Sequence, residues 1–115
     1  MKINGLLIDC ARLLEPREYY CRLLDFMAQW RMNTLLLHFS DDHGCVLKLK
    51  DFGGLASPRA FSTADLKTLL DHAQSRGIDV IPELEAFGHT RYITDNPRYR
   101  HLFAGRRTRA LCFNA

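Results

Sequence analysis

The chain contains 115 residues, of which 47% are hydrophobic and 25% charged, so it is long enough for one globular domain and too apolar for a disordered protein. Sixteen Lys and Arg residues oppose thirteen Asp and Glu residues, and the net charge of +3 is scattered apart from three Arg residues between positions 106 and 109. Dedicated nucleic-acid binding usually requires a basic stripe and a recognisable motif, so we expect no nucleic-acid partner. No apolar run approaches the roughly 18 residues of a membrane span, so we expect no membrane partner.

We expect no secretory signal, because the apolar run before Asp9 is shorter than the core of a signal peptide. We therefore expect a cytoplasmic protein. The four cysteines, Cys10, Cys21, Cys45 and Cys112, include no Cys-x-x-Cys pair, which disfavours a zinc ribbon or a redox pair. We interpret them as free thiols, in agreement with a reducing compartment.

The first half of the chain predicts a strand, a helix and a second strand. Apolar runs at 5–9 and 34–39 are typical of short strands that are buried on both faces. Between them, Glu15-Pro16 opens a helix that ends before Asn33. We expect the apolar face of this helix to consist of Tyr20, Leu23, Leu24 and Met27, widened by Tyr19, Phe26 and Trp30.

The second half begins with an irregular excursion over residues 40–61. Within it, alternation at 46–50 predicts a small half-exposed strand, and Ser57-Pro58 indicates a loop. A capping box at Ser62–Asp65 starts a second helix, which Gly77 ends. A third strand follows at 78–83, with short helical turns after it. The inner stripe of the second helix is expected to be Leu66, Leu69, Leu70 and Ala73.

Strands that alternate with helices predict an α/β fold with a parallel sheet, and right-handed crossovers place the helices outside. Each strand is followed by ionisable residues, and the carboxyl ends of parallel strands meet at one edge. We therefore expect a single cleft lined by all three groups. They are Asp9 and Arg12 after the first strand, His38, Asp41, Asp42 and His43 after the second, and Glu83, Glu85 and His89 after the third.

Each of these residues also has a structural interpretation. Asp9 could cap the following turn, Arg12 could be a surface charge, and His38 could be a hydrogen-bonded core histidine. The residue types around His38 and His89 would suit a metal, but their spacing matches no standard zinc signature. We therefore expect no metal site and no cofactor, and keep a metal-dependent hydrolase on a similar barrel as the rival enzyme.

Four segments resemble, in order, the motifs of the family 20 glycoside hydrolases, the β-N-acetylhexosaminidases. Residues 5–12 (GLLIDCAR) are similar to the family's RGxxxDxxR opening, and residues 33–44 (NTLLLHFSDDHG) to its NxxxxHxxDDQG segment. Residues 61–83 resemble the stretch that ends in RGIxVIPE, and residues 85–90 (EAFGHT) resemble DxPGHT. Departures from the family pattern occur at Asn4, His43, Cys45, Glu85 and Phe87.

The resemblance implies that residues 1–115, with no second domain, form the N-terminal part of a (β/α)8 TIM barrel, about its first three βα units. A full barrel needs about 250 residues. The family's catalytic Asp-Glu pair is expected after the fourth strand, and no Asp-Glu dipeptide occurs in this sequence. The isolated chain is therefore expected to contain no catalytic residue of its own and to be inactive. A non-catalytic partial gene product is the second rival.

For the complete enzyme the resemblance implies substrate-assisted, retaining removal of terminal β-linked N-acetylhexosamine, either GlcNAc or GalNAc, from a glycan or glycoside. In that scheme Arg12, His38 and Glu85 bind the sugar. Asp41 and His89 form a network that supports the acid, and Asp9 buttresses Arg12. Three strands cannot close a barrel, so we also expect the isolated chain to self-associate.

Overall fold

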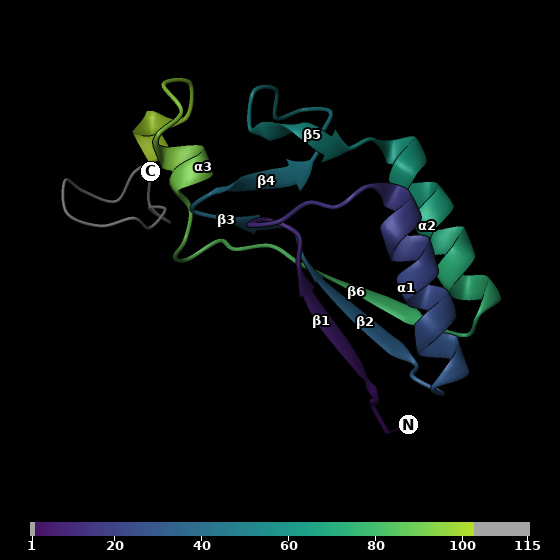
Figure 1. Ribbon diagram of the computed structural model, residues 1–115. Helices are drawn as coiled ribbons and strands as arrows, with labels where there is room; N and C mark the ends of the chain where they lie inside the picture. Colours follow the sequence, from purple (N-terminus) through teal and green to yellow (C-terminus); the bar gives the residue numbers. More distant parts are fainter. Residues whose placement is uncertain (1, 103–115) are drawn as a thin grey trace.

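The computed structural model describes residues 2–102. Its strands are β1 (Gly5–Asp9), β2 (Thr34–His38), β3 (Ser40–Asp41), β4 (Gly44–Leu47), β5 (Ala56–Phe61) and β6 (Asp79–Glu83). Its helices are α1 (Arg17–Gln29), α2 (Thr63–Ser75) and the short α3 (Arg91–Thr94), and a 3-10 turn covers Arg100–Leu102. The predicted order of strands and main helices is confirmed, and the chain has an α/β fold (Figure 1).

The central sheet is parallel, in the order β1-β2-β6. Its register is continuous across the three strands, so Leu7 lies beside Leu36 and Leu36 beside Ile81. Side chains alternate between the two faces of a strand, so this register also fixes which residues share a face. The prediction of a parallel sheet from three short apolar runs is confirmed.

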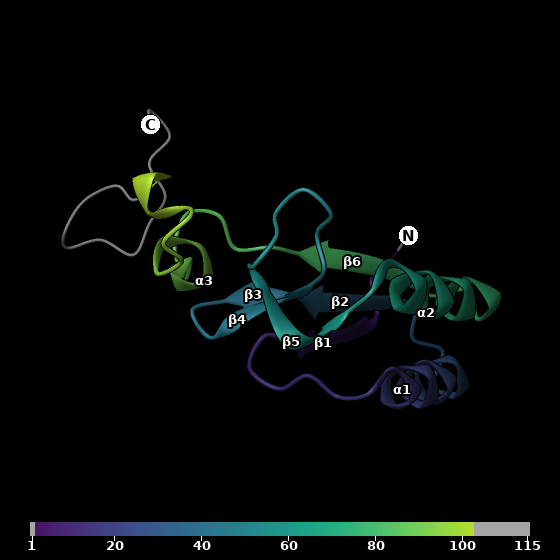
Figure 2. The same ribbon diagram turned by 90° about the horizontal axis from the view of Figure 1, so that it is seen from above.

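Helices α1 and α2 lie side by side against one face of this sheet (Figures 1 and 2). From the sheet, Leu35 and Leu37 are fully buried under the helices. From the helices, the buried side chains are Tyr20, Leu24, Met27, Leu69 and Ala73. The 3.6-residue repeat of apolar positions produces these contacts, because it sets a single stripe of each helix against the sheet.

The buried faces of α1 and α2 are narrower than the apolar faces that the sequence predicts. Phe26 and Trp30 are 46% and 64% exposed, and their rings pack on each other instead of on the sheet. Tyr19 and Leu70 are also exposed. The sheet that α1 and α2 cover has three strands, so only a narrow stripe of each helix is buried.

The two ends of α2 are as predicted. The Ser62 hydroxyl accepts a hydrogen bond from the Asp65 backbone N–H, and the Asp65 carboxylate accepts one from the Ser62 N–H, which completes a capping box. At the other end Gly77 has φ +68°, a left-handed conformation that glycine adopts without steric cost.

The opposite face of the sheet is not covered by any helix of the described residues (Figure 1). The middle row of this face is apolar. Leu7 is 61% exposed and Ile81 41% exposed, with the partly buried Leu36 between them. The sheet therefore has one face packed on helices and one apolar face in contact with solvent.

A second, smaller sheet has the order β3-β4-β5 and continues beyond the carboxyl end of β2 (Figure 1). The strand predicted at 46–50 is found at Gly44–Leu47 and is buried, because β3 and β5 pair on its two sides. The segment predicted as a loop around Pro58 belongs to β5. Proline is tolerated there because β5 is an edge strand and its pairing with β4 is irregular between Ala56 and Phe61.

The cysteines of the described part, Cys10, Cys21 and Cys45, are free thiols, as predicted. Burial raises the pKa of the Cys10 and Cys45 thiols, which disfavours the reactive thiolate. Cys112 and the Arg cluster at 106–109 lie outside the described residues. Within residues 2–102, no helix has the length and apolar composition to cross a membrane.

We predict that two adjacent Leu→Ala substitutions in α2 differ strongly in their effect on stability. Leu69 is 1% exposed and Leu70 is 48% exposed. Leu69→Ala should lower the free energy of unfolding by about 2–5 kcal/mol, because it leaves a cavity in the core. Leu70→Ala should lower the free energy of unfolding far less. Urea unfolding of both variants measures the difference, and equal losses would mean that both faces of α2 are packed.

Candidate functional site

Three ionisable residues end the three parallel strands in one row. Asp9, His38 and Glu83 are neighbours in the register of β1, β2 and β6. The two-residue alternation puts them on the same face as Leu7, away from α1 and α2. The polar row therefore lies at the carboxyl edge of the helix-free face, where the sequence predicts a cleft.

Asp9 holds Arg12 in the turn that follows β1. Its carboxylate accepts the Arg12 backbone N–H at 3.1 Å and also pairs with the Arg12 guanidinium. Asp9 therefore contacts both the backbone and the side chain of Arg12. Burial raises the pKa of Asp9, but the hydrogen bonds from Arg12 outweigh it and hold that pKa below its ordinary value.

The Arg12 guanidinium also reaches the hairpin between β3 and β4. Its Nη2 atom donates to Asp41 Oδ2 at 2.6 Å. The Asp41 side chain is 2% exposed, and its other oxygen accepts the His43 backbone N–H at 3.3 Å. A buried carboxylate needs such a counter-charge. Arg12 itself is 49% exposed, so part of the guanidinium faces solvent.

His89 approaches the same carboxylate from the loop after β6. Its Nδ1 atom lies 3.6 Å from Asp41 Oδ2 and 3.5 Å from Asp42 Oδ2. His89 has φ +51°, a left-handed conformation that costs a non-glycine residue about 1–3 kcal/mol. The surrounding contacts must therefore offset this strain. One of them is the hydrogen bond from the Arg91 backbone N–H to Asp42 at 3.1 Å.

His38 links this group of residues to a second one. Its Nδ1 atom lies 3.0 Å from Glu83 Oε2, and its Nε2 atom lies 3.9 Å from Asp41 Oδ2. Glu85 joins the second group, because its carboxylate, that of Glu83 and a ring nitrogen of His38 have atoms within 4.8 Å of one another. The structure thus brings together all the residues that the sequence predicts for the site. His43 and His89 have largely exposed side chains, at 67% and 57%.

Two residues that contribute to this geometry were not singled out from the sequence. Ser40 is fully buried, and its hydroxyl accepts the Glu85 backbone N–H at 2.9 Å. Tyr92 donates to the Glu85 carbonyl at 3.3 Å. Both fix the loop that carries Glu85. The signal that could have indicated Ser40 is its position directly after the apolar run at 34–39, where the chain remains buried.

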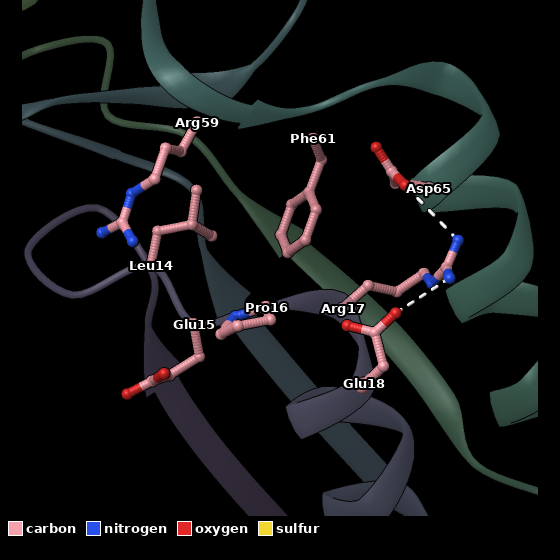
Figure 3. A pocket seen from close by; sticks show the side chains of 8 residues that line it. All are labelled: Leu14, Glu15, Pro16, Arg17, Glu18, Arg59, Phe61 and Asp65. Atoms are coloured by element: carbon pink, nitrogen blue, oxygen red, sulfur yellow. Dashed lines mark hydrogen bonds and ion pairs between the residues drawn. The ribbon is translucent and has the colours of Figure 1, made fainter.

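A separate cavity of about 300 Å³ lies between the amino ends of α1 and α2 and the end of β5 (Figure 3). Phe61 forms its apolar wall. Arg17 lines the cavity and pairs with Glu18 at 2.9 Å and with Asp65 at 3.5 Å. None of the residues of the polar row lines it, and we assign the candidate site to the strand ends instead.

Chemically, the strand-end site combines a guanidinium with free donor capacity and carboxylates in contact with imidazoles. The fork of an arginine suits two neighbouring oxygens, as in a polyol. A carboxylate beside an imidazole orients the ring. The site can therefore bind hydroxyl-rich ligands and support proton transfer by a neighbouring acid.

Comparison with known proteins identifies close similarity to one family. The family model described as the catalytic domain of glycosyl hydrolase family 20 matches residues 2–109. A β-hexosaminidase from Akkermansia muciniphila is 35% identical over 101 residues, which cover 75% of this chain and 20% of that protein. For a β-hexosaminidase from Vibrio furnissii the identity is 29% over 112 residues, covering 78% of this chain and 18% of that protein.

Solved structures give the same result for the fold. A β-N-acetylhexosaminidase crystal structure superposes with a TM-score of 0.87 at 26% identity, covering 98% of this chain and 29% of that chain. A Vibrio harveyi exo-β-N-acetylglucosaminidase, solved in complex with N-acetylglucosamine, has a TM-score of 0.79 at 24% identity. The superposition covers 90% of this chain and 19% of the Vibrio harveyi chain. This chain thus spans less than a third of each of these proteins.

We predict that Arg12→Gln raises the pKa of Asp9, because it removes the guanidinium and leaves the effect of burial. Since the pKa of Asp9 in the folded protein lies below the unfolded value of about 3.9, Asp9 contributes stability above that pH. This contribution to stability is lost as the pH falls through the folded-state pKa. In Arg12→Gln the contribution of Asp9 to stability should be smaller, because its folded-state pKa lies closer to the unfolded value. An NMR titration of the Asp9 carboxyl carbon measures the shift, with Arg22→Gln on α1 as the control. An unchanged pKa would contradict the assigned pairing.

Proposed function

This chain belongs to glycoside hydrolase family 20, and we propose that its 115 residues form the N-terminal part of a (β/α)8 catalytic barrel, about the first three βα units. Two features support the barrel. The helices cover one face of a parallel β1-β2-β6 sheet, and the other face carries an apolar row that further barrel strands would bury. The chain spans only 18–20% of the two β-hexosaminidases, so it corresponds to a part of those proteins.

The proposed reaction of the complete enzyme is the removal of terminal β-linked N-acetylhexosamine, GlcNAc or GalNAc, from a glycan or glycoside. In substrate-assisted, retaining hydrolysis the 2-acetamido oxygen of the sugar attacks the anomeric carbon while an acid protonates the leaving oxygen. The relatives described above are named as β-hexosaminidases, a β-N-acetylhexosaminidase and an exo-β-N-acetylglucosaminidase, and these names support this substrate class. No cofactor takes part in this chemistry.

The observation that carries the proposal is the position of Arg12. Asp9 and the buried Asp41 fix its guanidinium at the carboxyl edge of the sheet, and half of the side chain remains accessible. Its free N–H groups can then donate to two sugar hydroxyls. We assign His38, at the end of β2, and Glu85, in the loop after β6, to the same sugar pocket.

Asp41 and His89 have a positioning role in this proposal. At a separation of 3.6 Å the Asp41 carboxylate can orient the His89 imidazole, which in turn orients the catalytic acid. The acid and the residue that orients the acetamido group would come from an Asp-Glu pair, which this sequence does not contain. The chain alone is therefore proposed to be inactive.

We expect the purified 115-residue chain to show no turnover of an aryl β-N-acetylglucosaminide, since a positioned acid contributes about 10²–10⁴ to the rate. A chimera should restore activity. In it, residues 2–102 replace the corresponding segment of the Akkermansia β-hexosaminidase. In this chimera Arg12→Ala should lower kcat/KM about 10- to 100-fold, the effect of losing one or two charged hydrogen bonds. Arg22→Ala, on the exposed surface of α1, is the matched control.

Two results would contradict the proposal. Turnover by the isolated chain would mean that it carries an acid that the family comparison does not identify. Wild-type kinetics of the Arg12→Ala chimera, with the chimera itself active, would reduce Arg12 to a structural partner of Asp41.

The isolated chain is also proposed to self-associate. Its sheet has open edges at β1 and β6, and Leu7 lies exposed on the helix-free face. Sedimentation at micromolar concentration should detect a dimer or higher species, and Leu7→Asp should shift the chain towards monomer. Leu13→Asp, at an equally exposed position in the loop after β1, should not. A wild-type monomer at all concentrations would contradict this.

A further inference from the structure

The cavity between the amino ends of α1 and α2 plays no part in the proposed reaction. Its volume of about 300 Å³ is at the lower end of the range of about 300–1,000 Å³ that is typical of small-molecule sites. The lining combines three apolar side chains with two guanidinium and three carboxylate groups (Figure 3). This combination suits a small ligand that has both an apolar side and polar groups.

The apolar part of the cavity is held in place by the protein core. It consists of Leu14, Pro16 and Phe61, and the Phe61 ring lies in the middle of the view in Figure 3. Tyr20 and Phe39 pack edge-on against Phe61, with ring centroids 5.5 and 6.4 Å away. A ring that is already fixed loses little conformational freedom when a ligand covers it. The apolar part is therefore a preformed surface for a flat ligand with C–H groups on one side.

Two charged side chains of the lining have no partner within residues 2–102. Arg59 and Glu15 lie on the left of the view in Figure 3, and neither side chain makes a hydrogen bond or an ion pair in this part of the chain. The Arg59 guanidinium can only donate hydrogen bonds, and the Glu15 carboxylate can only accept them. A ligand that satisfies both groups must therefore accept and donate, as hydroxyl groups do.

The remaining polar groups of the cavity disfavour a charged ligand. Arg17 pairs with Glu18 at 2.9 Å and with Asp65 at 3.5 Å, so its charge is already compensated. Hydrogen bonds from Ser62 hold the pKa of Asp65 below its ordinary value, so this carboxylate is ionised near neutral pH. An anion would meet three carboxylates in the lining, and a cation would meet two guanidinium groups. A neutral ligand avoids both repulsions.

We propose that this cavity is a carbohydrate-binding site that takes one neutral pyranose unit of a glycan. The C–H groups of the sugar ring lie on Leu14, Pro16 and Phe61, while its hydroxyl groups accept hydrogen bonds from Arg59 and donate to Glu15. The fork of a guanidinium reaches two neighbouring hydroxyl oxygens at once. None of these five residues belongs to the strand-end row. The inference follows from the lining of the cavity and does not depend on the glycosidase proposal.

The test is an NMR titration of the 115-residue chain with N,N'-diacetylchitobiose, a neutral disaccharide of N-acetylglucosamine. We expect saturable shifts of the Phe61 ring and of the Arg59 guanidinium. Arg59→Gln and Glu15→Gln should each weaken the Kd measured at Phe61 by about tenfold or more, because each removes hydrogen bonds with a charged partner. Arg100→Gln, at an exposed position in the 3-10 turn, is the control. Arg12→Gln should also leave the Phe61 shifts unchanged.

Circular dichroism of each variant verifies the fold before titration. The proposal is overturned if the folded wild-type chain shows no saturable shift at Phe61 up to the solubility limit of the disaccharide. It is also overturned if inorganic phosphate, and not the disaccharide, saturates the Arg59 signal, which would assign an anion to the cavity. Binding that is lost in Arg12→Gln and kept in both the Arg59 and the Glu15 variants would overturn it as well. That last result would place the sugar at the strand ends and support the glycosidase proposal, so the two proposals can fail separately.

Discussion

The buried carboxylate of Asp41 is the point on which the strand-end site depends. It lies at the end of β3 with 2% of its side chain exposed, and a lone charge in that position would be strongly unfavourable. Arg12 from the turn after β1 provides the opposite charge, and His89 from the loop after β6 lies 3.6 Å away. One desolvated charge thus holds together segments that are far apart in the sequence.

The helix-free face is organised in layers along the strands. An apolar row of Leu7, Leu36 and Ile81 is followed, two residues further along each strand, by the polar row of Asp9, His38 and Glu83. The apolar row supplies a surface to bury, and the polar row lies where the strands end and loops can reach it. The residues available for packing and the ionisable residues therefore occupy different positions along the strands, on the same face of one sheet.

Sequence reasoning could predict much of this because the decisive signals are local. Apolar runs, a capping box at Ser62 and a glycine stop at Gly77 each specify their own segment. The parallel topology then follows from their order, and it brings the polar strand ends together.

The features that sequence reasoning missed depend on contacts between distant segments. Burial of β4 results from pairing on both sides, and Pro58 fits in β5 because that edge pairing is irregular. Exposure of Phe26 and Trp30 reflects how few strands α1 covers. The proximity of Glu85 to His38 and Glu83 depends on Ser40 and Tyr92, which fix the loop after β6. No local pattern encodes these pairings.

The two-residue alternation of β2 has a consequence for how this segment can change in evolution. An insertion or deletion of one residue between Thr34 and His38 would turn the imidazole towards the helices and direct Leu37 at the carboxylates, because a shift of one position exchanges the two faces. A length change in the exposed stretch at 48–54 leaves this alternation unaltered. Gaps between related sequences should therefore collect in that stretch and be absent from β2, while single substitutions within the strand remain possible.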